Sequence, residues 1–320
     1  MSSPLIFIHF GNSEYLQYTL RCAKHFNPNK RIILLGDSTN NKYSSIGIEH
    51  HSINAYEYGD KLDKFNTLYR FIGGRLAKES KWMKFVFQRW FIIYNFIISN
   101  KIQSFWTMDS DNLILTDLEK FEPYFQHFDC TEQCESKCMN GYISHQNVVE
   151  GYLDKMIELF TREDYLEKQR NDFLQHPTWA YTEMRAYETY KEEENITTVS
   201  LSKVIENSTF DSNITFSHGM EMNTYTVQGG SKIKSLYYHP SGELYTYHIK
   251  SQSYIKLNSI NCSWVPLNVF IVLTNAALYQ KLKPHKATKG TMVKLNLKTP
   301  FFMQLFSKLK SLFRRLFFLI

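Results

Sequence analysis

The chain has 320 residues, which is enough for one large α/β domain or two smaller ones. Its residues are 43% hydrophobic and 16% aromatic, so it can bury a substantial core. Charged residues of both signs make up only 21%, which excludes a disordered chain. The net charge is +6, but ten of the 37 Lys and Arg residues lie after residue 280, where there is no Asp or Glu. The mildly acidic body argues against nucleic-acid binding across the fold, and the basic tail points to an anionic surface, with a membrane as the first candidate.

The first elements along the chain predict a βαβ unit. Residues 5–10 (LIFIHF) form an apolar run typical of a buried strand, residues 14–25 have helical spacing, and residues 31–35 form a second apolar run. Strand, helix and strand joined by short loops predict a parallel sheet that binds its ligands at the carboxyl ends of the strands. The first run lacks a preceding basic stretch, so we expect a strand and not a signal peptide.

The middle of the chain continues this alternation. Residues 46–53 indicate a third strand, and residues 61–78 are a mixed helical region. Residues 85–98 are strongly apolar but too short to span a bilayer, so they predict a buried helix. Residues 104–108 (SFWTM) predict a strand that runs into Asp109-Ser110-Asp111.

Beyond the Asp pair the pattern becomes mixed. Residues 147–170 predict one amphipathic helix and residues 179–194 a second. Residues 198–270 contain short β-like runs separated by turns that contain glycine. We therefore expect an α/β part followed by a mixed α+β part.

The five cysteines are odd in number and sparse, which predicts a reducing, cytosolic compartment. On that view the four Asn-x-Ser/Thr sequons are chance occurrences. Cys130, Cys134 and Cys138 are four residues apart and would share a face on a helix. A zinc site normally needs four ligands, and no clear fourth is present, so packing is the favoured interpretation.

Asp109 and Asp111 stand two residues apart at the end of an apolar strand. Two carboxylates there form a hard-oxygen site, which suits Mg²⁺ or Mn²⁺ bound together with substrate phosphates. The alternative is a solvated turn with two acids.

Several segments resemble GT-A-type nucleotide-sugar glycosyltransferases, in a bacterial-like form. The segment WTMDSDNLILTDL resembles the Asp-x-Asp region of that family, in which the acids bind a divalent metal on the donor diphosphate. Weaker likenesses occur in the same order, over roughly residues 4 to 195: LIFIHFGNSEYLQYTL, RIILLGD, FQRWFIIYNFI, MNGYISH and TEMRAYETY.

The resemblance implies a GT-A-like (Rossmann-like) α/β fold, a mostly parallel sheet flanked by helices with a mixed α+β C-terminal part. It implies Mn²⁺ or Mg²⁺ as the cofactor and a UDP- or GDP-sugar as the donor. Asp109 and Asp111 are the implied metal ligands, and Glu183 the implied general base or acceptor-binding acid. The implied donor-binding residues are His9, Gly11, Asn12 and Asp37 at the nucleoside, Arg89 at the diphosphate, and Asn140 and Gly141 at the sugar.

Two of these residues have alternative interpretations. Arg89 could pair with a buried acid instead of the diphosphate, and Asp37 could be an ordinary turn residue after a strand. There is also a departure from the family. Many GT-A enzymes supply a third metal ligand from a late His, which we expect near residues 258–266, but that segment reads LNSINCSWV. The nearby candidates are His218, His239 and His248.

We expect three parts: a glycosyltransferase domain at 1–280, a basic linker at 281–300 and an amphipathic helix at 301–320. In the last segment large apolar residues recur at steps of three and four with Lys and Arg opposite them, which predicts a helix lying on an anionic membrane. Docking of that face onto the body or onto a partner helix is the alternative. These features predict a peripheral enzyme on the cytoplasmic face of a membrane.

The predicted function is therefore transfer of a sugar from a nucleoside-diphosphate sugar to a hydroxyl of a glycan or lipid-linked acceptor. The alternatives are a metal-dependent nucleotidyltransferase and a membrane-surface protein with an inactive core. The chain has no Walker A loop, no Gly-x-Gly-x-x-Gly after the first strand and no Gly-x-Ser-x-Gly elbow. These absences argue against P-loop kinases, dinucleotide oxidoreductases and α/β-hydrolases.

Overall fold

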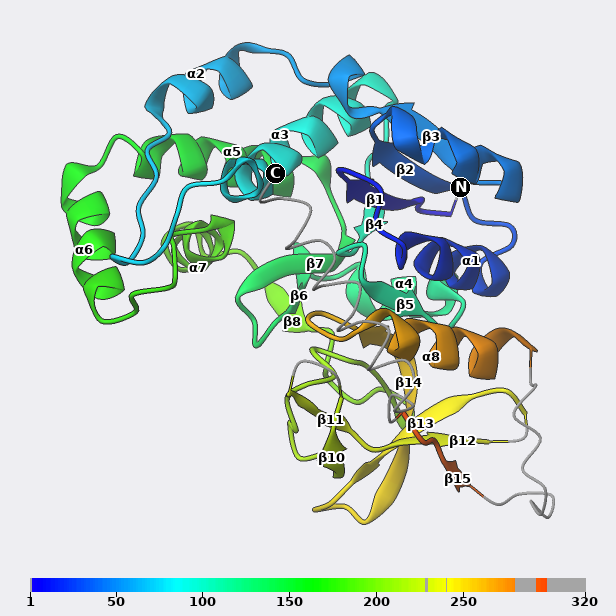
Figure 1. The fold of residues 1–320 in the computed structure, drawn as a ribbon. Helices are drawn as coiled ribbons and strands as arrows, with labels where there is room; N and C mark the ends of the chain where they lie inside the picture. Colours follow the sequence, from blue (N-terminus) through cyan, green and yellow to red (C-terminus); the bar gives the residue numbers. More distant parts are fainter. Residues whose placement is uncertain (1, 228–229, 240, 280–291, 298–320) are drawn as a thin grey trace, which may run out of the picture. The chain divides into compact units, whose positions relative to one another are not determined.

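The computed structural model describes residues 2–227, 230–239, 241–279 and 292–297 (Figure 1). The chain forms two compact units. Unit 1 consists of Met1–Ser13, Asn27–Ser110 and Asp117–Lys203, and unit 2 of Glu14–Phe26, Asp111–Thr116 and Val204–Ile320. The boundary between them passes through the Asp-x-Asp motif, between Ser110 and Asp111.

Unit 1 is built on a seven-stranded sheet with the order β3-β2-β1-β4-β7-β6-β8. Strands β1, β2, β3 and β4 are parallel to their neighbours in that set, β7 is antiparallel to β4 and β6, and β8 is parallel to β6. The prediction of a mostly parallel sheet is confirmed. The strands are β1 Leu5–His9, β2 Ile32–Gly36, β3 Glu49–Ser52, β4 Phe105–Thr107, β6 Cys130–Gln133, β7 Cys138–Ile143 and β8 Thr198–Ser200.

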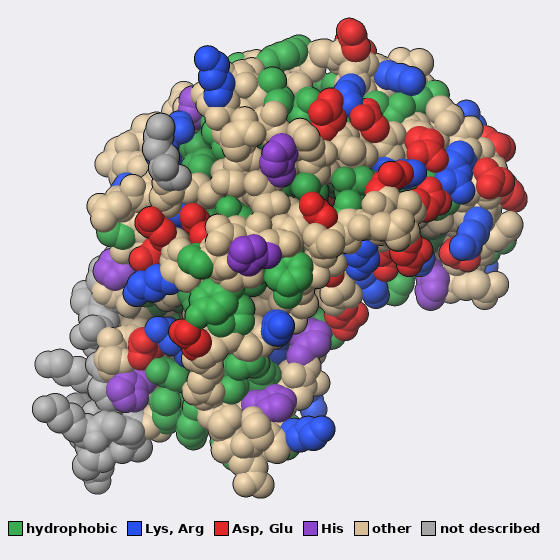
Figure 2. All heavy atoms as spheres, turned by 180° about the vertical axis from the view of Figure 1, so that it is seen from behind, with side chains coloured by type: hydrophobic (Ala, Val, Ile, Leu, Met, Phe, Trp, Pro, Cys, Tyr) green, Lys and Arg blue, Asp and Glu red, His purple; other side chains and the backbone are tan. Residues whose placement is uncertain are grey.

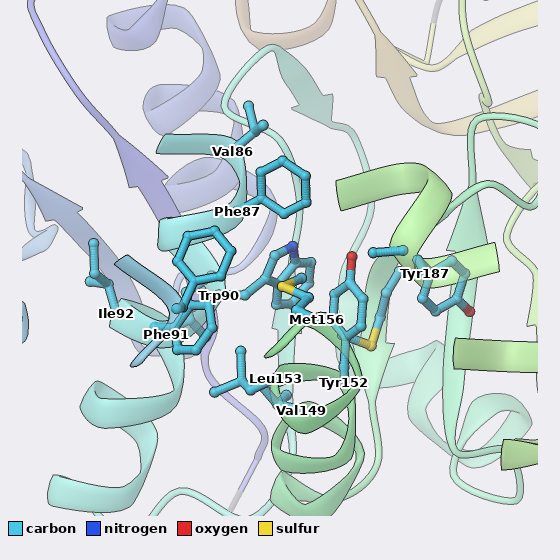
Figure 3. Packing of buried hydrophobic residues seen from close by; sticks show 14 of the residues in the cluster. Val86, Phe87, Trp90, Phe91, Ile92, Val149, Tyr152, Leu153, Met156 and Tyr187 are labelled. Carbon is cyan, nitrogen blue, oxygen red and sulfur yellow. The ribbon is translucent and has the colours of Figure 1, made fainter. Parts of the chain in front are cut away.

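Helices pack their apolar side chains against one face of this sheet to form the core of unit 1. Figure 3 shows its centre, where Trp90 of α3 meets Tyr152 of α5 edge-on, with ring centroids 5.6 Å apart. The predicted buried helix at 85–98 is the centre of α3. The helices are α2 Asp60–Leu68, α3 Lys81–Ser99, α4 Glu122–Phe125, α5 Gln146–Leu159, α6 Glu163–Leu174 and α7 Glu183–Glu194, with 3-10 turns at η1 Ser38–Ile46, η2 Ile53–Ala55 and η3 Leu118–Phe121.

Two predicted helical regions in unit 1 were wrong in their extent. The region at 61–78 is helical only in α2, Asp60–Leu68. The single helix expected at 147–170 is two helices, α5 and α6, because the buried Phe160 ends α5 and the chain turns at residues 161–162 before α6 begins. The packing interpretation of the cysteines fits Cys130 and Cys138, which are buried, although none of the three cysteines lies on a helix. Cys130 begins β6 and Cys138 begins β7, and the turn between these strands contains Cys134 in the left-handed region with φ 52°.

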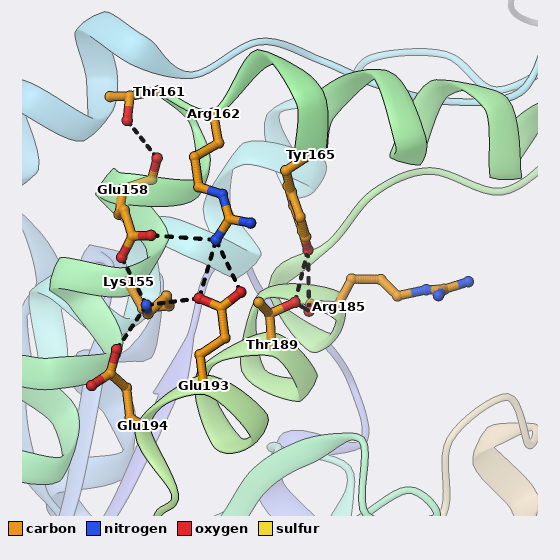
Figure 4. Close-up of polar contacts among 9 residues, drawn as sticks. All are labelled: Lys155, Glu158, Thr161, Arg162, Tyr165, Arg185, Thr189, Glu193 and Glu194. Carbon is orange, nitrogen blue, oxygen red and sulfur yellow. Dashed lines mark hydrogen bonds and ion pairs between the residues drawn. The ribbon is translucent and has the colours of Figure 1, made fainter.

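An ion-pair network fastens α5 to the end of α7 (Figure 4). The buried Lys155 of α5 lies 2.7 Å from Glu158, 3.0 Å from Glu193 and 2.7 Å from Glu194, and Arg162 also pairs with Glu193 at 2.9 Å. A buried cation needs such partners, since its desolvation would otherwise be costly. The network therefore holds the C-terminal end of the helix whose first residue is Glu183.

Unit 2 contains an antiparallel sheet with the order β15-β12-β13-β14-β5, beside which β9 runs parallel to β14. Strands β10 and β11 form a separate hairpin. Helices α1 and α8 contribute apolar side chains to the core of this unit. The elements are α1 Leu16–Phe26, β5 Asn112–Ile114, β9 Ser208–Phe210, β10 Met222–Thr226, β11 Lys232–Lys234, β12 Leu236–Tyr238, β13 Leu244–His248, β14 Ser253–Asn261, α8 Leu267–Tyr279 and β15 Val293–Lys294.

The predicted basic linker at 281–300 is described only at residues 292–297. There Val293–Lys294 forms β15, which pairs with β12, and Leu295 and Leu297 are buried in the core of unit 2. The predicted membrane-surface helix at 301–320 lies outside the described residues. In the described part of the chain, no helix has the length and apolar character to cross a membrane.

Acidic and basic side chains are mixed on the face that Figure 2 shows. On the face of the molecule in Figure 2, Lys and Arg side chains alternate with Asp and Glu side chains among the described residues, without a broad field of one sign.

Candidate active site

The site begins where β4 ends. This strand is buried and lies between β1, to which it is parallel, and β7, to which it is antiparallel. Met108, Asp109 and Ser110 follow it directly. Because β1, β2 and β4 are parallel, their carboxyl ends meet at the same edge of the sheet, and the residues after each strand are brought together there.

Arg89 of α3 connects two acids of unit 1. Its Nη1 donates to Asp109 Oδ1 at 2.5 Å, and its Nη2 donates to Glu183 Oε1 at 2.8 Å. We call Asp109, Arg89 and Glu183 the carboxylate clamp. Of the two interpretations of Arg89, the pairing with acids is the contact present. The Arg89 Nε is buried and has no hydrogen-bond partner among the described residues.

Burial and neighbouring charges shift the pKa values of Glu183 and Arg89. Burial raises the pKa of Glu183 to about 7, with Arg89 lowering it and Asp109 raising it. Burial works against the charged form of Arg89, but Asp109 and Glu183 outweigh that effect and raise the Arg89 pKa. The Tyr152 hydroxyl donates to the backbone carbonyl of Glu183 at 2.6 Å and fixes the first turn of α7. Glu183 is therefore a carboxyl group that can exchange a proton near neutral pH.

Asp111 belongs to unit 2, where the end of β14 holds it. Its Oδ2 accepts a hydrogen bond from Ser263 Oγ at 2.9 Å, and its backbone carbonyl accepts from Cys262 N at 3.0 Å. The next residue, Asn112, pairs with Asn261 in the β5–β14 ladder. The segment in which we expected a late His thus supplies Ser263, a neutral hydroxyl, as the partner of Asp111.

The residues present fit a divalent metal that shares its coordination shell with substrate. Mg²⁺ commonly takes one or two carboxylates and completes its shell with substrate phosphates and water. The Asp109 side chain is 31% exposed, so a hydrated cation can reach it. Within the described residues there is no group of three or more His, Cys, Asp or Glu side chains that could hold a metal. The late His candidates, His218, His239 and His248, accordingly complete no such group there.

Three of the residues predicted at the nucleoside lie together in unit 1. Asp37, which follows β2, accepts from the backbone N–H of Gly11 at 2.6 Å and from that of Thr39 at 2.8 Å. Asn12 Oδ1 accepts from Lys42 Nζ at 2.5 Å. Burial tends to raise the pKa of Asp37, but the hydrogen bonds from Thr39 and Gly11 lower it overall. Asp37 is also the N-cap of η1, so the turn interpretation holds as well.

His9 connects the end of β1 to the middle of the Asp-x-Asp motif. Its Nδ1 lies 2.8 Å from Ser110 Oγ, and the imidazole is buried. Burial lowers the pKa of His9 to about 4, against the opposing effect of Asp37. The ring is therefore neutral at physiological pH and acts as a hydrogen-bonding group.

Asn140 and Gly141 have structural contacts in β7. The buried Asn140 amide donates to Gln133 Oε1 at 2.9 Å. Gly141 pairs with Thr107 of β4 and has φ +99°, and a Cβ there would lie 2.2 Å from Thr131 Oγ1. Only glycine fits this position, so both residues have a role in the sheet. Their expected place beside the donor sugar stays a prediction.

Comparisons with known proteins identify no family for this chain. No protein-family model matches the chain, and no curated protein matches it. Among the matching solved structures is mouse xyloside xylosyltransferase 1 in its apo form, with 9% sequence identity, a TM-score of 0.44, and coverage of 63% of this chain and 86% of that one. With so low an identity and TM-score, this likeness supports no function for the chain.

Proposed function

We propose that this chain is a metal-dependent glycosyltransferase that moves a sugar from a nucleoside-diphosphate sugar to a hydroxyl acceptor. The carboxylate clamp is the observation that carries the proposal. A buried guanidinium joins the acid at the end of β4 to a second acid whose pKa is near neutrality. Metal-assisted group transfer needs a carboxylate for the cation and a separate group able to accept a proton.

Asp109 and Asp111 are the residues that would hold Mn²⁺ or Mg²⁺. When bound, the cation would neutralise charge on the donor diphosphate and make the nucleoside diphosphate a better leaving group. Hard carboxylate oxygens suit these ions. The hydrogen bond from Ser263 to Asp111 orients one of the two carboxylates from outside the coordination shell, as supporting residues of metal sites commonly do.

Glu183 is proposed as the general base, or as an acid that binds the acceptor hydroxyl. Its raised pKa places it near half-ionisation at neutral pH, where a carboxylate can accept the proton that the attacking hydroxyl releases. Arg89 keeps this carboxylate in place through a charge-assisted hydrogen bond of 2.8 Å. Because both arms of Arg89 are paired with Asp109 and Glu183, Arg89 would contact a diphosphate only by giving up one of these ion pairs.

The nucleoside of a UDP- or GDP-sugar is proposed to bind at the ends of β1 and β2, where Gly11, Asn12 and Asp37 lie together. A ribose hydroxyl or a base N–H could donate to the Asp37 carboxylate, which its neighbours keep ionised. His9 would support this edge through Ser110. Asn140 and Gly141 are proposed to border the donor sugar.

The acceptor is proposed to be a glycan or a lipid-linked sugar at the cytoplasmic face of a membrane, with residues 301–320 as the membrane contact. Liposome flotation tests this part. Full-length protein should float with anionic vesicles, and a chain ending at Pro300 should not. If the two chains float equally, residues 301–320 are not the membrane contact.

A donor screen scored by released nucleotide tests the function itself. UDP- and GDP-hexoses are supplied with Mn²⁺, with Mg²⁺ or with EDTA, and the Asp164→Asn variant serves as the control because Asp164 is an exposed acid of α6. The proposal predicts release of UDP or GDP from one donor only when metal is present. Pyrophosphate release from a nucleoside triphosphate and a sugar phosphate would instead indicate the nucleotidyltransferase.

A further inference from the structure

Trp264 stands in an unusual position beside Asp111. At 85% exposure it is the most exposed large hydrophobic side chain of the described residues. Its φ of 66° lies in the left-handed region, which bulky side chains rarely adopt. The residue before it, Ser263, donates to the Asp111 carboxylate.

The surrounding turn forces this conformation. Cys262 is buried, and its carbonyl accepts from Val265 N at 3.3 Å, which closes a turn around Ser263 and Trp264. Val265 packs against the core of unit 2. The Ser263 hydroxyl also lies 2.6 Å from Asn261 Oδ1. With both flanks fixed, the indole is held out in solvent.

A strained backbone and a solvent-exposed indole are both unfavourable for the free protein. Residues held in sparsely populated backbone regions cluster at ligand-binding sites, where the surrounding structure keeps them in place. Tryptophan is also the side chain that combines a large flat apolar face with a polar N–H, and it is enriched at binding surfaces. The position therefore fits a ligand with a flat apolar face and polar edges.

We infer that Trp264 is the stacking platform for a pyranose ring of the acceptor. A pyranose presents C–H groups on its face and hydroxyls around its edge. The indole face would cover the C–H groups, and Ser263 and Asp111 would lie beside the hydroxyls. The inference rests on the proposed function in naming the acceptor. The residues proposed to contact the nucleoside, diphosphate and sugar of the donor belong to unit 1, whereas Trp264 belongs to unit 2 together with the proposed metal ligand Asp111. Sugar binding itself does not depend on the proposed function.

The first experiment measures sugar binding alone. Methyl hexopyranosides and lactose are titrated into the protein while tryptophan fluorescence is recorded. At least one sugar should change the fluorescence, and the change should disappear in Trp264→Phe, whose ring stacks but does not report. Trp82→Phe is the matched control, because Trp82 is 57% exposed on α3 in unit 1. Absence of any change in the wild type, or persistence of the change in Trp264→Phe, would overturn the inference.

The second experiment uses the donor identified by the nucleotide-release screen, with the sugar that binds as acceptor. Trp264→Gly should raise the KM for the acceptor about tenfold, equivalent to about 1.4 kcal/mol, with donor hydrolysis in the absence of acceptor unchanged. Trp264→Phe should stay within about twofold of the wild type. An equal rise in the donor KM would assign the stacked ring to the donor and overturn the acceptor assignment.

The third measurement separates binding from packing. Glycine adopts φ 66° without strain but loses more backbone entropy on folding, and the two effects are each about 1 kcal/mol, so Trp264→Gly should unfold within a few degrees of the wild type. A clear fall in the unfolding temperature would mark Trp264 as a packing residue and contradict the inference. A wild type that binds sugar but hydrolyses no donor would refute the glycosyltransferase proposal and leave the Trp264 site standing.

Discussion

The guanidinium of Arg89 lies 2.8 Å from the carboxylate of Glu183, and both side chains are largely buried. Such a pair keeps a carboxyl group with a near-neutral pKa at a fixed position. Because the same guanidinium also holds Asp109, the proposed proton acceptor and one proposed metal ligand share a single support.

Glu183 should set the pH dependence of turnover. A base must be deprotonated, so turnover by the wild type should rise with pH through about 7, the pKa to which burial raises this group. Glu183→Gln should lower kcat by about 100-fold or more and leave nucleotide binding intact. The check is a kcat–pH profile for both proteins. A Gln variant that retains the wild-type profile would exclude Glu183 as the base.

Removal of Arg89 should destabilise unit 1. Arg89→Ala leaves Glu183 buried without its partner, and breaking a buried ion pair costs about 3 kcal/mol or more. Arg89→Lys keeps the charge but not the fork that reaches two acids, so it should be intermediate. Urea unfolding of both variants measures the effect.

A second substitution tests the reason for that loss. Adding Glu183→Gln to Arg89→Ala removes the uncompensated charge, so the double variant should regain part of the lost stability. If the two losses simply add, the carboxylate clamp is not a coupled unit.

His9 should make the protein sensitive to mild acid. Its pKa falls from 6.5 to about 4 on folding, so the unfolded chain takes up a proton first as the pH drops. The contribution of the neutral His9 ring to the free energy of unfolding is fully present above pH 6.5. It is lost as the pH falls towards 4, and the total loss is about 3 kcal/mol. His9→Gln should flatten this slope when urea unfolding is compared at pH 7.5 and pH 4.5. An unchanged difference between the two pH values would exclude His9 as its source.

Ser263 should support the affinity of Asp111 for metal. Loss of a supporting hydrogen bond to a metal ligand commonly weakens metal binding about tenfold or more. We expect that loss for Ser263→Ala when Mn²⁺ is titrated in the presence of nucleoside diphosphate. Ser241→Ala is the matched control, because Ser241 donates to Glu243 at 3.0 Å on the same unit. If Ser263→Ala and Ser241→Ala bind Mn²⁺ with equal affinity, the hydrogen bond from Ser263 does not support metal binding by Asp111.

Local sequence pattern predicted the elements around the site better than the contacts between them. The apolar runs at 5–10, 31–35 and 104–108 are strands because residues buried on both faces of a parallel sheet must all be apolar, and that pattern is visible in the sequence. It also located Asp37 and Asp109 at strand ends. Such features depend on neighbours along the chain.

Contacts between residues far apart in the sequence could not be predicted. The pairing of Arg89 with Glu183 joins residues 94 positions apart, and the contact of Ser263 with Asp111 joins residues 152 apart. Helical periodicity alone gave no sign of the turn at 161–162. The equal spacing of the three cysteines is compatible with one helix face, because spacing does not reveal the left-handed turn at Cys134 that reverses the chain.

Sugar transfer by this chain should depend on a metal that Asp109 and Asp111 hold. The test is the rate of Mn²⁺-dependent nucleotide release from the identified nucleotide-sugar by wild type, Asp111→Asn and Asp109→Asn, each first checked for native stability. Asp109→Asn also alters the partner of Arg89, so Asp111→Asn is the decisive variant. If the metal is held there, Asp111→Asn should abolish the metal-dependent rate at unchanged stability. A rate equal to that of the wild type would contradict it.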